Sequence, residues 1–117
     1  MIPMHYILGG RSGRTPRVCP NLRAWKAFMD DPAQYKVDET DITLDVRVST
    51  IFTGIDCSHT DMMVLSDAPI LFETVVMGGP LNGHIFYAQT WDEAQACHDG
   101  VLHALIPELA AARGIEA

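Results

Sequence analysis

Strict alternation of apolar and polar residues from position 42 to 49 limits the possible folds of this chain more than any other feature. The apolar positions are Ile42, Leu44, Val46 and Val48. This period-two pattern is typical of a β-strand with one buried face, and residues 50–52 extend it. A second strand is predicted at 70–77, where denser β-branched residues indicate a central position. Because a glycine-rich turn at 78–83 leads into a return strand at 84–89, the sheet is expected to be antiparallel.

Two helices are predicted to flank these strands. The first, at 22–29, follows Asn21, which is a favourable N-cap residue. The second begins at a capping box, 90–93, and Pro107 is expected to end it. Residues 30–41 are acidic and irregular, which predicts a connecting loop. The expected fold class is therefore α+β: an antiparallel β-sheet of four to five strands, with a short N-terminal helix and a C-terminal helix packed on it.

The length and composition indicate one domain in a reducing compartment. With 117 residues, 48% of them hydrophobic, the chain is long enough for one core and too short for two, so a single domain over residues 1–117 is expected. No stretch reaches the roughly 18 apolar residues that cross a membrane. The first ten residues lack the basic start and long apolar stretch of an export signal. Three scattered cysteines form no disulfide framework, which favours a cytoplasmic location.

The charges are unevenly distributed along the chain. Residues 1–29 carry five basic residues and no carboxylate, and the remainder carries three basic and fifteen acidic residues, for a net charge of −7. This balance argues against binding to duplex nucleic acid, which requires a positive field. The glycine-rich segment at 9–15, which contains Arg11 and Arg14, fits either a plain hairpin turn or a loop that cradles an anion.

The motifs for catalysis and metal binding are weak. Neighbouring cysteines and histidines at 57–59 and 97–98 lack the repeated pairs of a zinc site, and no Walker motif or nucleophile elbow is present. We expect no catalytic residue, no metal and no cofactor. A small phosphodiesterase that uses His59, His84 or His98 with nearby carboxylates remains an alternative. So does a phage accessory protein without a small ligand, whose basic N-terminus contacts a partner chain.

Three residues of the central strands and turn fit a nucleotide. Arg47 offers a guanidinium for phosphate, Phe72 an aromatic ring for a base, and Asn82 an amide for an adenine edge. Each also fits a structural role. Phe72 suits the core, Arg47 suits a cross-strand pair with Asp45 or Glu73, and Asn82 suits a turn before a glycine. The residues alone leave both interpretations open.

Segments 45–56, 69–80 and 87–100 resemble a family of small phage proteins, the first-described anti-Thoeris sponges. The Phe-Glu-Thr…Gly-Gly-Pro string of the second segment is the most specific part. The resemblance implies a single ligand-binding domain in the host bacterial cytoplasm that sequesters cyclic ADP-ribose isomers, the signals of TIR-domain defence proteins, without cleaving them. It also implies self-association as a dimer or hexamer. In the family the hexamers also hold cyclic oligonucleotides of the CBASS defence pathway.

The same resemblance assigns roles to individual residues. Phe72 corresponds to the base-stacking aromatic, Asn82 to the polar contact on the ligand, and Arg47 to the phosphate-directed arginine. Arg11 or Arg14 corresponds to an N-terminal arginine of the second, cyclic-oligonucleotide pocket. The chain departs from the family in its C-terminal helix, which has no arginine before position 113.

Overall fold

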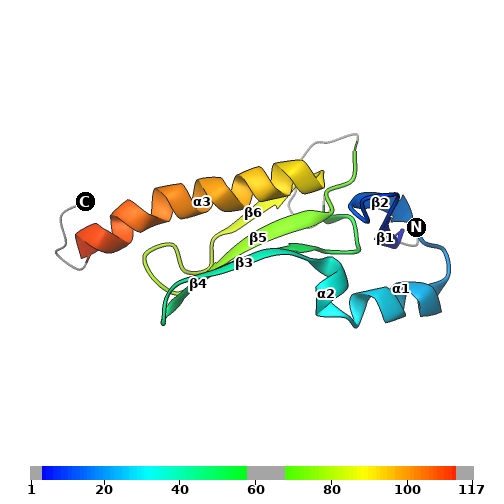
Figure 1. Cartoon of the computed structure of the whole chain (residues 1–117), viewed down its shortest axis with the longest axis horizontal. Coiled ribbons are helices and arrows are strands. Elements are labelled where there is room, and N and C mark those ends of the chain that lie inside the picture. The colour runs from blue at the N-terminus through cyan, green and yellow to red at the C-terminus, as the bar shows by residue number, and fades with distance from the viewer. Residues whose placement is uncertain (1–3, 58–67, 113–117) are drawn as a thin grey trace.

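A four-stranded antiparallel sheet, covered on one face by a long C-terminal helix, forms the centre of the fold (Figure 1). The computed structural model describes residues 4–57 and 68–112. The elements in chain order are β1 (Tyr6–Gly9), β2 (Thr15–Val18), α1 (Leu22–Met29), α2 (Pro32–Tyr35), β3 (Lys36–Thr43), β4 (Val46–Phe52), β5 (Phe72–Met77), β6 (Ile85–Ala88) and α3 (Trp91–Ala112). The large sheet has the order β3-β4-β5-β6, and β1 and β2 form a separate hairpin. The predicted α+β fold, with its sheet, short N-terminal helix and packed C-terminal helix, is confirmed.

The first strand was predicted at the wrong place. The alternation at 42–49 crosses a turn, because the chain reverses between Thr43 and Val46 and pairs β3 with β4. Leu44, expected on the buried face, lies fully exposed at the tip of this hairpin. Residues 30–41, predicted as a loop, contain α2 and most of β3. An edge strand tolerates many charged residues, so β3 lacks the pattern that sequence analysis looks for.

Pro107 does not end the C-terminal helix, which continues to Ala112. Proline removes one backbone hydrogen bond from a helix interior. Leu105 and Leu109, on either side of it, are both buried against the sheet. We infer that this packing holds the helix together across the proline. The predicted start is correct, since the Glu93 amide donates to Thr90 Oγ1 at 3.1 Å.

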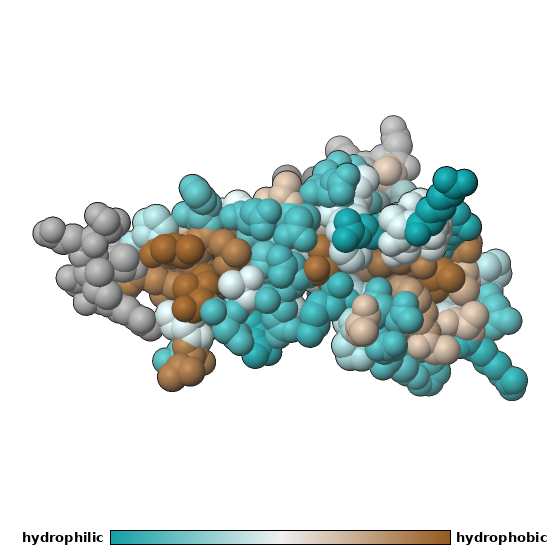
Figure 2. All heavy atoms as spheres, viewed as in Figure 1, coloured by the Kyte–Doolittle hydropathy of each residue, from teal (hydrophilic) through white to brown (hydrophobic). Residues whose placement is uncertain are grey.

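The hydrophobic core consists of two clusters with a polar layer between them. The first cluster contains Leu8, Phe52, Leu71, Phe72, Ala88 and Ala94. The second contains Val46, Val48, Val76, Val101, Leu105 and Leu109. Between them lie Thr50, Thr74 and His98, each no more than 1% exposed. On the face drawn in Figure 2, hydrophobic residues likewise gather toward both ends of the molecule, with hydrophilic residues between them.

Residues 4–35, here called the N-terminal module, attach to one end of the sheet (Figure 1). The Trp25 indole Nε1 donates to the Gly54 carbonyl at 3.1 Å, and the Phe28 ring meets Phe52 edge to face. Leu8 joins the first core cluster. The glycine-rich loop between β1 and β2 is thereby held close to the start of α3. No helix among the described residues is long and apolar enough to cross a membrane.

Candidate functional site

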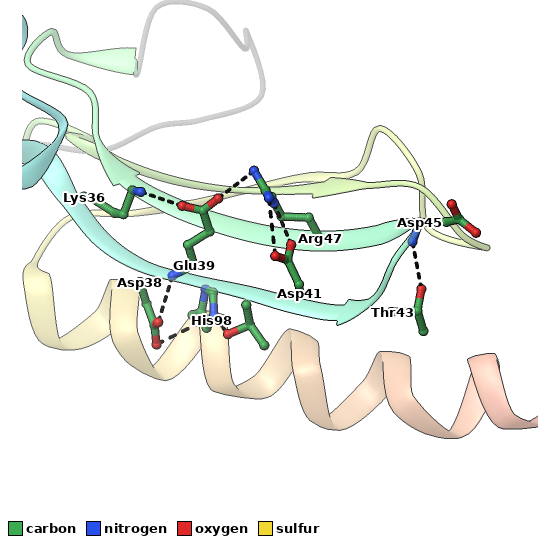
Figure 3. A network of polar contacts seen from close by, with 9 residues as sticks. Lys36, Asp38, Glu39, Asp41, Thr43, Asp45, Arg47 and His98 are labelled. Atoms are coloured by element: carbon green, nitrogen blue, oxygen red, sulfur yellow. Dashed lines mark hydrogen bonds and ion pairs between the residues drawn. The ribbon is translucent and has the colours of Figure 1, made fainter.

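Arg47 lies on the face of the sheet opposite α3, and carboxylates of β3 hold its guanidinium (Figure 3). Its Nε donates to Asp41 Oδ1 at 2.6 Å and its Nη1 to Glu39 Oε1 at 2.7 Å. The Lys36 ammonium pairs with the other oxygen of Glu39. The hydrogen bond from Arg47 lowers the pKa of Asp41, and that from Lys36 lowers the pKa of Glu39. The positive charge of Arg47 is therefore already compensated within the protein.

A hollow of about 650 Å³ lies beside Arg47 at the tip of the β3–β4 hairpin. Asp41 and Asp45 line it together with Arg47, so its wall is acidic on balance and unfavourable for phosphate. Asn82 belongs to the turn at this same end of the sheet. Its side-chain oxygen accepts a hydrogen bond from the Gly78 amide at 2.7 Å, which is the turn-forming role.

Phe72 lies at the other end of β5 and on the opposite face of the sheet. It is fully buried, and its ring centroid is 5.4 Å from that of Phe52 and 6.4 Å from that of Trp91. Arg47 pairs with Met77, five residues along β5 and so about 16 Å away. The structure thus brings Arg47 and Asn82 to one end of the sheet and leaves Phe72 in the core at the other.

Arg14 projects from the β1–β2 loop onto the first residue of α3. Its Cζ lies 4.9 Å from the centroid of the Trp91 ring, within the range of a cation–π interaction. A hollow of about 420 Å³ adjoins this pair. Its lining residues are Ser12, Arg14, Thr15, Pro16, Thr90, Trp91 and Asp92. Arg14 was among the predicted ligand-binding residues, whereas Trp91 was not, because its only signal was an aromatic residue directly after a predicted N-cap.

The other arginines of the N-terminal module do not line this hollow. Arg11 lies exposed in the same loop, and Arg17 packs over Gly9 on β1. Among the residues that the structure describes, none of the arginines between positions 11 and 23 takes part in an ion pair. They contrast with Arg47, which is held by two carboxylates. Within residues 4–57 and 68–112, the arginines that remain available to an anion therefore lie in the N-terminal module.

The histidines named for the phosphodiesterase alternative do not converge in the described residues. His98 is fully buried on α3, between Thr50 at 2.8 Å from its Nδ1 and Thr40 at 2.9 Å from its Nε2. His84 is exposed in the turn before β6, and its Nδ1 lies 2.9 Å from the Leu81 carbonyl oxygen. His59 lies outside the described residues. Within the described ranges, no group of three potential metal ligands is assembled.

Comparisons with known proteins add no assignment. No family model matches the chain, and no curated protein and no solved structure gave a match.

Proposed function

We propose that this chain captures a cyclic adenine nucleotide, of the cyclic ADP-ribose type, in the cytoplasm of a phage-infected bacterium and holds it without cleaving it. The observation that carries the proposal is the Arg14–Trp91 pair at the edge of the 420 Å³ hollow. An indole face stacks on an adenine base, and a guanidinium binds phosphate. The exposed Arg14 side chain lies over the indole face, so it can turn from the ring to a phosphate as a base takes its place.

The charge distribution supports a small anion rather than a polymer. The arginines of the N-terminal module are free of carboxylate partners among the described residues, whereas the remainder of the chain is strongly acidic. A compact dianion can approach the module and remain clear of the acidic surface. A long polyanion would be repelled along most of its length.

The sites that the resemblance implies require rearrangement in this structure. Phosphate at Arg47 would have to displace Asp41 or Glu39. Phe72 is fully buried in the first core cluster, so a base could stack on it only after that cluster opened. The Arg14–Trp91 hollow requires a smaller change: the exposed Arg14 side chain, which lies over the indole face, has to turn aside for a base to stack there. We therefore place the ligand at the N-terminal module, with Arg11 as a second cation beside Arg14.

The test is capture and release. Purified protein is incubated with cyclic ADP-ribose isomers and with cyclic oligonucleotides, free ligand is removed by filtration, and the protein is heated. Intact ligand in the heated fraction is the expected result. Degraded ligand would support the phosphodiesterase alternative, and complete recovery in the first filtrate would refute capture of those ligands.

Matched arginine variants locate the site. Arg14→Gln should weaken capture at least tenfold, because it removes the guanidinium that is proposed to bind phosphate. Arg23 is also exposed but lies on α1 outside the hollow, so Arg23→Gln should leave capture unchanged. If Arg47→Gln abolishes capture and Arg14→Gln does not, the ligand binds at the hairpin end, as the resemblance implies.

A further inference from the structure

The charges that line the Arg14–Trp91 hollow balance each other. Among the described residues that line it, Arg14 is the one cation and Asp92 the one carboxylate. Both side chains are exposed, and they form no ion pair with each other. The hollow therefore suits a ligand that carries negative charge on one part and hydrogen-bond donors on another.

Asp92 has no side-chain partner in the part of the chain that the structure describes. Its carboxylate makes no ion pair and accepts no hydrogen bond there. The next residue, Glu93, differs, because its side chain accepts from the Gln89 amide at 3.2 Å and completes the capping box. A carboxylate in the first turn also stabilises a helix, so a test of Asp92 has to separate ligand binding from stability.

The three groups of the hollow correspond to the three parts of a nucleotide. Asp92 directly follows Trp91 at the start of α3, and Arg14 reaches the same ring from the β1–β2 loop. In the complex proposed above, the base lies on the indole ring and Arg14 turns to the phosphates. The ribose joins the base to the phosphates, so it lies in the hollow that the Asp92 carboxylate lines.

A carboxylate recognises a ribose through its hydroxyl groups. An ionised carboxylate only accepts hydrogen bonds, and its two oxygens can accept from two neighbouring hydroxyls. Acidic side chains bind the ribose 2′-hydroxyl in this way in dinucleotide-binding folds. The same negative charge repels a phosphate that is esterified to one of these oxygens. Asp92 can therefore distinguish a free pair of ribose hydroxyls from a pair in which one oxygen carries phosphate.

We propose that Asp92 determines the specificity of the hollow, by selecting adenine nucleotides whose ribose keeps both its 2′- and 3′-hydroxyls free. This inference rests on the proposed function, since it concerns the same hollow. Cyclic ADP-ribose carries such a hydroxyl pair. In a 3′,5′-linked cyclic oligonucleotide, every 3′-oxygen carries a phosphate instead. The hollow therefore favours the first class of ligand over the second.

Isothermal titration of the full chain with cyclic ADP-ribose and with its 2′-deoxyadenosine analogue tests this role. The natural chain should bind cyclic ADP-ribose about tenfold more tightly, because the analogue lacks a hydroxyl that donates to Asp92. Asp92→Asn should lower this ratio to about threefold or less, because the charge that strengthens the hydrogen bond is gone. Glu108 is an exposed carboxylate of α3 outside the hollow, so Glu108→Gln should leave the ratio unchanged. The natural chain should bind 3′,5′-cyclic diadenylate no more tightly than the analogue.

The ratio separates recognition from folding, because both affinities are measured on the same protein and a loss of helix stability in Asp92→Asn cancels. An unchanged ratio in Asp92→Asn would overturn the role of Asp92 and leave nucleotide capture standing. So would a natural chain that binds the analogue or the cyclic diadenylate as tightly as cyclic ADP-ribose. If none of these ligands binds the natural chain, their capture is refuted as well, so the two failures give different results.

Discussion

Replacement of His98 by leucine should destabilise the protein by about 2–3 kcal/mol, although leucine is apolar and similar in size. His98 is fully buried, and both ring nitrogens make hydrogen bonds, to Thr50 Oγ1 at 2.8 Å and to Thr40 Oγ1 at 2.9 Å. Each such bond contributes about 1 kcal/mol net. The variant loses both bonds and leaves the two threonine hydroxyls without this partner.

The hydrogen bond that remains between the Thr50 and Thr74 hydroxyls limits the loss of stability. Thr50 Oγ1 lies 2.6 Å from Thr74 Oγ1, so these two buried groups still bond to each other in the variant. Thr40 is only half-buried and can turn to water. The full desolvation penalty of an orphaned buried group is thereby avoided. A loss well above about 3 kcal/mol would mean that the cluster packing also fails.

Urea denaturation, followed by circular dichroism, measures this loss directly. For a chain of 117 residues, 1 kcal/mol corresponds to about 4 °C in the midpoint of thermal unfolding. The matched control is the triple variant His98→Leu, Thr50→Val, Thr74→Val, which removes the whole polar layer. It should recover most of the lost stability, because no fully buried hydroxyl is left without a hydrogen-bond partner. If His98→Leu alone costs less than about 0.5 kcal/mol, the reasoning is wrong.

Three further predictions concern the caps, turns and charges. Asn21→Ala should cost about 1 kcal/mol in urea denaturation, since the Asn21 side chain accepts from the amides of residues 23 and 24 at 3.0 and 3.1 Å. Gly83→Ala should cost about 1–2 kcal/mol because its φ is +87°. Gly78→Ala should cost considerably more, because its Cβ would also collide with the Asp45 carbonyl, and equal losses would contradict this. Stability should fall with pH below about 5 as carboxyls with lowered pKa values, such as Asp41, take up protons. Arg47→Gln should flatten this decline in the urea midpoint, and an unchanged slope would show that the ion pair is unimportant.

Much of the fold could be predicted because several elements carry local signals. The N-cap at Asn21 and the capping box at 90–93 fix the starts of two helices, and both are where expected. The edge strand β3 could not be predicted, because its charged residues resemble a loop. The turn at 44–45 was hidden for a related reason. An exposed leucine at its tip continued the apolar alternation of the strands on both sides.

The candidate site was harder to predict, because its side chains depend on partners that are distant in sequence. Asp45 and Glu73 were the expected carboxylate partners for a structural role of Arg47. Its carboxylate partners instead come from β3, a strand that was not predicted. Phe72 and Trp91 are both aromatic, so from the sequence either ring could stack on a base. Only the packing of α3 onto the sheet shows that Phe72 is enclosed and that Trp91 borders the hollow.

The buried polar layer connects the stability of the fold to the position of the candidate site. Around His98, α3 lies on a sheet surface rich in valine and other apolar side chains, which do little by themselves to fix where a helix lies along its axis. His98 reaches Thr40 on β3 and Thr50 on β4, and these hydrogen bonds can be made at only one position of the helix. Trp91 lies about two turns earlier on α3, so the same bonds determine how far its ring stands from Arg14. We infer that the triple variant, although nearly as stable as the natural chain, should hold its Arg14–Trp91 pair less firmly. A weaker capture of ligand at unchanged stability would demonstrate this link, and unchanged capture would show that the N-terminal module alone positions the helix.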